Sequence, residues 1–261
     1  MATYFAAVGA LGVAALALPG SRVPPVTVKY RVDQSLTQQV DGTASGAGKQ
    51  VLRFSTATFV TVTLTDSAGG RTMRVVIDSM KGDSATPIPV AVMDSARGGE
   101  FRAFLSRTGK PSPLTPTGTS PAASQVQGLL SDFFPWVRPG LKVGEAWADT
   151  SVNTTGAGSD TVTVRRVTNY RAAASETRDA TKAVKITSDH TSKVSGNQPT
   201  PQGTATIEGT GNGTGTYFVS PDGRYLGGDW QLHSALKLSG SFAKEPVPIT
   251  VDQTTKVTAL R

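Results

Sequence analysis

Cysteine is absent from the 261-residue chain. The absence excludes disulfides, thiolate metal sites and cysteine nucleophiles. It also excludes a lipid-modified N-terminal cysteine, so we do not expect a standard lipoprotein. Histidine is nearly as scarce, with only His190 and His233. Acid–base catalysis and metal binding therefore have few side chains available to them.

Long runs of charge are also missing. The net charge of +7 favours anionic partners. The basic residues are scattered in pairs such as Arg165 and Arg166, and aromatic side chains are not interleaved with them. A nucleic-acid surface requires both features, so we expect no nucleic-acid partner. These cations are expected on the solvated faces of strands.

No catalytic constellation stands out. Asp189, His190 and Ser192 suggest a triad, but neighbours along a strand point to opposite faces, and no GxSxG elbow is present. His233 follows the polar phase of its strand and is expected in solvent. The carboxylates are dispersed, without spacings that indicate paired catalysis or metal ligation. We expect a protein that is not an enzyme, with no catalytic residues, cofactor or metal.

Glycine is abundant, with 28 residues, and apolar side chains alternate with polar ones. Val26, Val28 and Tyr30 share one phase of such an alternation. Turn sequences such as Asp66–Gly70 and Ser220–Gly223 separate the runs, which is typical of hairpins. The sequence predicts a mainly β protein: a large curved antiparallel sheet or partial barrel, built as a β-meander. One short helix is expected to pack on it, with an N-terminal apolar helix in addition.

The chain is predicted to form a single β-rich exported domain. Its expected parts are strands within 26–107, a proline-rich connector at 109–121, a helix at 121–134 and strands within 140–260, the domain covering 26–260. The order of strands, helix and strands is similar to half-barrel carriers that move lipids or lipoproteins across bacterial periplasms. The similarity is one of architecture alone, because no motif matches residue by residue.

The predicted helix has a clear start and end. Ser120 and Pro121 supply an N-cap and a first-turn proline, while Pro135 follows the last helical positions. Val126, Leu129, Leu130 and Phe133 share one face, so the helix is expected to pack on the apolar face of the sheet. The last strand carries Pro246 and Pro248 at its start, which predicts that it begins with an unpaired edge.

The segment EGTGNGTGT at 208–216 resembles a phosphate loop only in its glycine content. A P-loop requires a Lys-Ser/Thr pair after the last glycine and a following helix, and neither is present. Alternate glycines within a strand remove the side chains from one face. We therefore predict strong curvature or a close backbone approach there.

Residues 1–20 form a signal peptide or an N-terminal membrane anchor. The uncharged stretch 2–18 would span about 25 Å as a helix, close to the ~30 Å hydrocarbon core. Ala15–Ala17 offers small residues for cleavage, but no Lys or Arg precedes the stretch, so both interpretations stay open. The candidate membrane-helix residues are Tyr4, Phe5, Val8, Leu11, Val13 and Leu16.

A group of large apolar side chains is the remaining candidate site. Three interpretations are open: sheet core, an apolar cavity for a lipid or other hydrophobic ligand, and contact with a membrane or protein partner. The group comprises Leu129, Leu130, Phe133, Phe134, Trp136, Trp147 and Trp230.

Two functions follow as hypotheses. The first is a non-catalytic accessory or structural subunit of a membrane protein assembly, held by its N-terminus at the periplasmic (extracytoplasmic) face. Its expected partners are that complex and the membrane surface. The alternative is a periplasmic half-barrel carrier or binder of a lipid or other hydrophobic ligand.

Overall fold

The computed structural model describes residues 24–43, 46–118, 121–130, 133–178, 180–200, 203–241 and 243–260. The predicted N-terminal helix, with its six candidate membrane residues, lies outside them. Within these ranges, no helix combines the length and the apolar character needed to cross a membrane.

One antiparallel sheet dominates the described chain. The elements are β1 (Val26–Gly42), β2 (Gly48–Ser67), β3 (Gly70–Gly82), α1 (Val90–Ser95), β4 (Glu100–Ser106), β5 (Thr115–Thr117), α2 (Pro121–Leu130), β6 (Ala146–Ala157), β7 (Asp160–Arg178), β8 (Thr181–Thr200), β9 (Gly203–Val219), β10 (Tyr225–Ser239) and β11 (Val247–Leu260). The predicted mainly β fold is confirmed.

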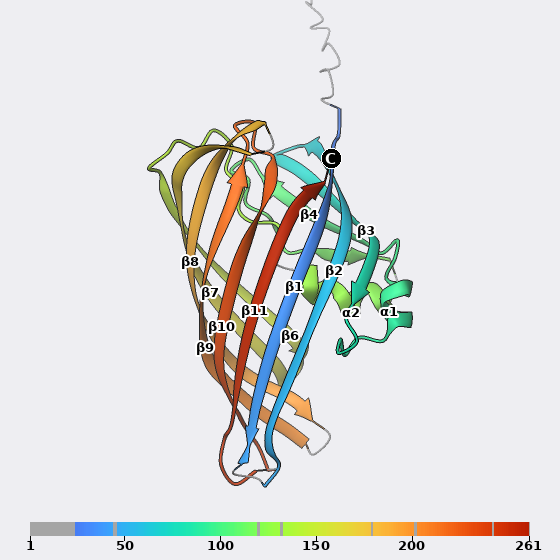
Figure 1. Cartoon of the computed structure of the whole chain (residues 1–261). Helices are drawn as coiled ribbons and strands as arrows, with labels where there is room; N and C mark the ends of the chain where they lie inside the picture. Colours follow the sequence, from blue (N-terminus) through green and yellow to red (C-terminus); the bar gives the residue numbers. More distant parts are fainter. Residues whose placement is uncertain are drawn as a thin grey trace, which may run out of the picture.

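The strand order is β5-β4-β3-β2-β1-β11-β10-β9-β8-β7-β6. Two meanders, β1–β5 and β6–β11, are joined where β1 pairs with β11 along a ladder from Lys29 and Leu260 to Val40 and Ile249. Among the described residues β5 and β6 are the two edges and do not pair, so the sheet stays open. Figure 1 shows it curled about a trough. We call the inner face of this curl the concave face.

Side-chain alternation explains why one face is buried. Tyr30 and Val32 on β1, Val60 on β2, Val75 on β3 and Phe101 on β4 are at most 2% exposed. Their sequence neighbours point outward, because successive side chains alternate across a strand. On β3, Met73, Val75 and Ile77 alternate with residues of the other face and are buried.

The helices differ in part from the prediction. As expected, α2 packs on the sheet, and Val126 and Leu130 are fully buried in the core. The described helix ends at Leu130, however, so the predicted helix at 121–134 is too long at its C-terminus. Pro135 disfavours a helical conformation at Phe134. Sequence analysis also missed α1, a six-residue helix that buries Met93 but is too short to show a helical period.

Two further expectations concern proline. Over the described residues 109–118 the proline-rich connector contains no helix, and it includes the short strand β5, which pairs with β4. In β11, Val247 and Pro248 pair with β10 alone, and the ladder to β1 begins at Ile249. The strand therefore begins with one unpaired edge, as its prolines predict, and then runs through the middle of the sheet.

Candidate functional site

The concave face has three zones along the strands, and β8 shows them most clearly. Its inward residues are Ile186, then Ser188, His190 and Ser192, then Val194. An apolar zone thus gives way to a polar belt and then to a second apolar zone. The cross-strand register places further polar side chains such as Arg166 and Ser234 at this level, together with the apolar Leu36, Leu232 and Val251.

The first zone is filled by a plug, which we define as α2 together with residues 133–137. Leu130, Phe133 and Phe134 are at most 8% exposed. Phe133 contacts Tyr30 edge-on at 6.3 Å, and Phe134 contacts Tyr225 at 5.3 Å between ring centroids. These three predicted site residues are therefore core, whereas Leu129 packs at its margin.

The other predicted aromatic residues form a neighbouring group around Tyr170. Trp147 stacks on Tyr170 at 5.3 Å and an interplanar angle of 10°, and Trp136 meets the same ring edge-on. The Trp136 indole N–H donates to the Thr108 carbonyl at 2.8 Å. Trp230 is buried against Tyr217. The structure thus gathers the whole predicted group around the plug, mainly as core.

Below the plug, β9 forms a crease in the sheet. Gly209, Gly211, Gly213 and Gly215 all face inward. A Cβ on Gly213 would lie less than 3.0 Å from the Gln231 carbonyl oxygen and from His190 Nε2. Glycine alone permits this approach of the flanking strands. Of the two alternatives predicted for 208–216, the close backbone approach is confirmed.

The polar belt lies at the level of this crease. It consists of inward-facing polar side chains from six strands: Gln34, Gln38, Thr56, Arg166, Ser188, His190, Ser192, Ser234, Gln253 and Thr255. Ser188 and Thr56 are 2% and 4% exposed, and their hydroxyl oxygens have no hydrogen-bond partner. An unpaired buried polar group lowers the stability of the folded state by about 1–3 kcal/mol, so a hydrogen-bond partner for these hydroxyls would be favourable.

The second apolar zone lies at the end of the sheet where β1 turns into β2, and we call it the lower zone. Seven of its inward side chains are partly exposed and do not belong to the core cluster under the plug: Val40, Val162, Val164, Val194, Leu236, Leu238 and Ile249. These seven come from β1, β7, β8, β10 and β11. Ile207 and Val247, the cross-strand neighbours of Leu238, are buried. The lower zone is therefore an apolar concave surface without a covering element among the described residues.

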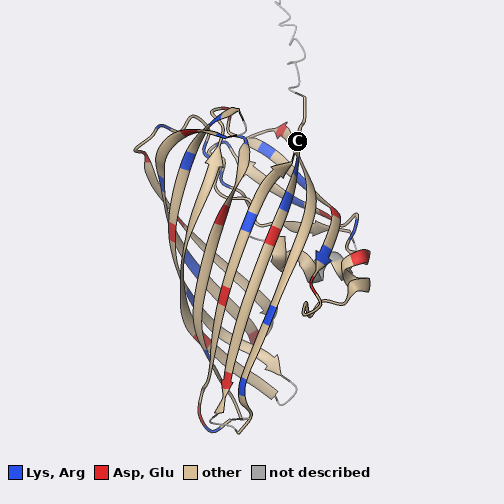
Figure 2. Ribbon diagram, in the orientation of Figure 1, with Lys and Arg blue, Asp and Glu red and all other residues tan. Residues whose placement is uncertain are grey.

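Lys, Arg, Asp and Glu are scattered along the strands (Figure 2), and several of them alternate with inward residues and therefore lie on the outer face. Asp33, Lys256 and Asp229 are cross-strand neighbours there. They line a shallow polar groove of about 660 Å³. His233 lies on the same face, with Nδ1 2.7 Å from an Asp252 carboxylate oxygen, so its predicted exposure is confirmed. Asp189 also faces outward, away from His190, as strand alternation predicts.

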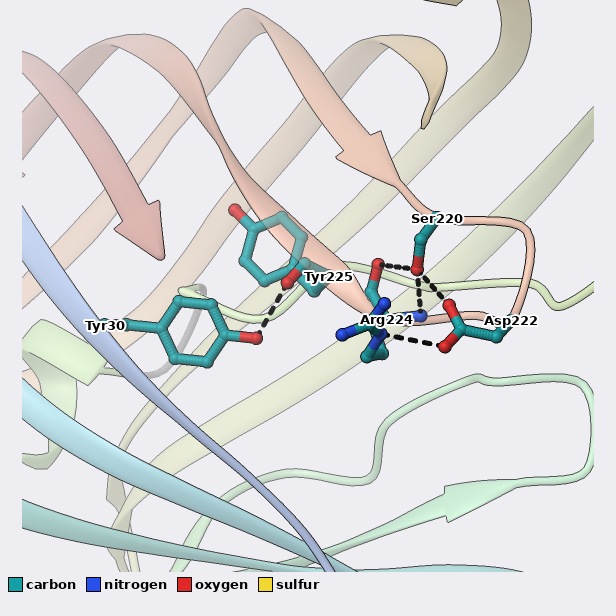
Figure 3. Close-up of polar contacts among 5 residues, drawn as sticks. All are labelled: Tyr30, Ser220, Asp222, Arg224 and Tyr225. Atoms are coloured by element: carbon teal, nitrogen blue, oxygen red, sulfur yellow. Dashed lines mark hydrogen bonds and ion pairs between the residues drawn. The ribbon is translucent and has the colours of Figure 1, made fainter. Parts of the chain in front are cut away.

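Two buried tyrosines connect the plug to the β9–β10 turn (Figure 3). The Tyr30 hydroxyl donates to the Tyr225 carbonyl at 2.8 Å, and the two rings stack at 5.7 Å. Burial raises the pKa of both phenols above the usual value near 10. In the turn, Ser220 Oγ donates to Asp222, and Arg224 Nε donates to Asp222 at 2.8 Å.

No protein-family model matches the chain, and no curated protein matches its sequence. In the described ranges, no three His, Asp or Glu side chains are grouped to hold a metal ion. What the arrangement offers is hydrogen bonding in the polar belt beside an apolar surface in the lower zone.

Sequence analysis missed the polar belt, although a signal for it exists. On β8 the phase that begins with the apolar Val184 and Ile186 turns polar at three successive inward positions before returning to Val194. The analysis used alternation to reject the triad but did not follow that phase along the strand. Inward polar residues within an apolar phase are the feature that marks this site.

Proposed function

We propose that the protein binds a hydrophobic chain in the lower zone of its concave face. The observation that carries the proposal is the set of partly exposed inward Val, Leu and Ile side chains outside the plugged core. A contiguous apolar patch on a concave surface is a preferred place for a ligand or partner. The plug fills the opposite end of the trough, so the proposed ligand occupies the lower zone rather than a cavity beneath α2.

The position of Leu236 allows a direct test. It lies in the lower zone between Gly209 of β9 and Ile249 of β11. Leu236→Trp would fill the zone without adding charge. Val152 on β6 is 62% exposed and lies outside the lower zone, so Val152→Trp is a matched control.

The experiment is solvent extraction of the native protein followed by mass spectrometry, with displacement of a fluorescent apolar probe as the quantitative assay. We expect an extracted long-chain compound from the wild type and from Val152→Trp. We expect at least a 10-fold weaker probe affinity for Leu236→Trp, equivalent to about 1.4 kcal/mol. Equal binding by all three proteins, or none by the wild type, would refute the proposal.

The other sequence-based hypotheses stay proposals. An accessory role in a membrane assembly, an extracytoplasmic location and N-terminal anchoring all depend on residues 1–20, outside the described ranges. The absence of enzymatic activity is likewise a prediction. The open edge at β6, which pairs with β7 alone and whose residues 150–156 are exposed, supports a protein partner at that edge.

A further inference from the structure

The free edges of the sheet differ in their protection against pairing with another chain. Natural proteins protect such edges with short strands, prolines, bulges or charged side chains. β5 is three residues long and includes Pro116. The lower part of β2, residues 48–54, pairs with β1 but not with β3, and it carries Lys49 and Arg53. Both edges therefore have features that discourage pairing.

Along residues 150–156, β6 has none of these protective features. The segment contains no charged residue and no proline, and its register with β7 runs without a shift. In the described chain β7 is its only strand partner, and all seven residues of the segment are exposed. The apolar side chain of Val152 is 62% exposed. An edge of this kind offers unpaired backbone N–H and C=O groups to a strand of another chain.

We propose that β6 pairs with the β6 strand of a second copy of this chain, forming an antiparallel two-fold dimer. Such a pairing brings the same surface of both copies together and closes the assembly at two chains. It suits a segment without charge, because no like charges are opposed. Pairing through the lower edge of β2 would instead bring Lys49 and Arg53 of the two copies together. The inference goes beyond ligand binding in the lower zone and does not depend on it.

The exposed segment also determines the register of the pairing. A two-fold axis at its midpoint places Asn153 opposite Asn153 of the second copy, and all seven residues of the segment are then paired. Asp149, whose carboxylate is paired with Lys110 in its own chain, stays away from the axis. Val152 lies opposite Thr154 of the second copy, and β-branched residues suit such cross-strand positions. The two Asn153 side chains meet on the other face, where each amide can donate to and accept from the other.

The first test is disulfide formation across the axis. The chain has no cysteine, so the cysteine of an Asn153→Cys variant is its only thiol. Opposed residues of an antiparallel pair have Cα atoms ~4.5–5.5 Å apart, within the ~4.4–6.8 Å that a disulfide spans. We expect the purified full chain of this variant to give a covalent dimer on mild oxidation, seen by non-reducing denaturing electrophoresis. Val51→Cys is the matched control, because Val51 is 53% exposed on the β2 edge, and it should remain a monomer.

The second test changes only the charge at the axis. Asn153→Asp places two carboxylates opposite each other, and such a juxtaposition opposes association. Seven paired residues form a small interface, so we expect the wild type to dimerise with a micromolar dissociation constant in sedimentation equilibrium. Asn153→Asp should weaken dimerisation at least ~10-fold. Asn212→Asp, at an exposed position on β9 in the middle of the sheet, should leave it unchanged.

The melting temperature of Asn153→Asp should match that of the wild type at low concentration, which separates loss of the contact from a folding defect. Equal disulfide formation by Asn153→Cys and Val51→Cys would overturn the proposal. A wild type that stays monomeric at high concentration, or equal dimerisation of the wild type and Asn153→Asp, would overturn it as well. If oxidation in a cell extract links Asn153→Cys to a different protein and not to a second copy, the choice of partner is wrong. Probe binding in the lower zone is measured separately, so each proposal can fail alone.

Discussion

Alanine substitutions along the β9 crease should differ sharply in cost although the chemical change is identical. At Gly213 the new Cβ would meet the Gln231 carbonyl oxygen, a backbone atom that cannot move without bending β10. At Gly211 its nearest neighbours are the hydroxyls of Ser192 and Ser234, at 2.6 and 2.7 Å. Hydroxyls can rotate away, whereas the backbone cannot. Gly213→Ala should therefore be the more destabilising change.

The magnitudes follow from two opposing effects. Replacing glycine with alanine restricts the unfolded chain and contributes about 0.4–1 kcal/mol of stability. Overpacking of a filled site costs about 1–3 kcal/mol, and a backbone clash lies at the upper end of that range. We expect Gly213→Ala to lower the free energy of unfolding by about 2 kcal/mol, and Gly211→Ala by less than about 1 kcal/mol. For a domain of this size, 2 kcal/mol corresponds to about 4–8 °C in melting temperature.

Urea unfolding followed by circular dichroism measures these differences. Gly128 on α2 supplies the control, because a Cβ there would meet no atom within 4 Å. Gly128→Ala should stabilise the protein by about 0.5–1 kcal/mol through helix propensity. If Gly213→Ala is no more harmful than Gly211→Ala, the flanking strands do not approach β9 as described, and the crease is refuted.

Two other predictions concern the buried tyrosines. Tyr30→Phe leaves the Tyr225 carbonyl without its donor and should cost about 1–3 kcal/mol, measured by the same urea titration; no loss would mean that water or another group replaces the hydroxyl. Because burial raises the pKa of Tyr30 and Tyr225, their contribution is complete below pH 10 and is lost as the pH rises toward the folded pKa. Burial raises the pKa of Tyr170 as well, so the free energy of unfolding should fall by about 4 kcal/mol per pH unit above pH 10. Tyr225→Phe should lower that slope by about a third, and an unchanged slope in the variant would contradict the assignment.

Much of the fold could be predicted because strands and hairpins have sequence patterns that extend over only a few neighbouring residues. The alternation of Val26, Val28 and Tyr30, and the turns at Asp66–Gly70 and Ser220–Gly223, indicate strands and hairpins directly. The alternate glycines of β9 likewise predict curvature from the absence of side chains. Each of these features depends on residues close together in the sequence. The presence of strands and hairpins, and the close approach at the alternate glycines, were therefore predictable.

The parts that could not be predicted depend on distant pairing. The pairing of β1 with β11 leaves no local signal in the sequence. Without this pairing, the six strands that contribute to the polar belt cannot be placed in one sheet. The polar belt combines Arg166 of β7, His190 of β8 and Thr56 of β2, and only the strand pairing places these inward side chains on the same face. The end of α2 has a local signal in Pro135, which disfavours a helical conformation at Phe134. The contact of Phe134 with Tyr225, by contrast, depends on tertiary packing.

The ladder between β1 and β11 also has a consequence for how the chain folds. All other strand pairs in the described sheet join neighbours in the sequence, so each meander can form through short loops. Joining the two meanders brings Val32 to Val257, nearly the full length of the domain apart, and such long-range pairing is slow to form. During synthesis on the ribosome, the edge of β1 that pairs with β11 would lack its hydrogen-bonding partner until the final strand has been synthesised. That interval is when the growing chain is most exposed to misassembly with another copy.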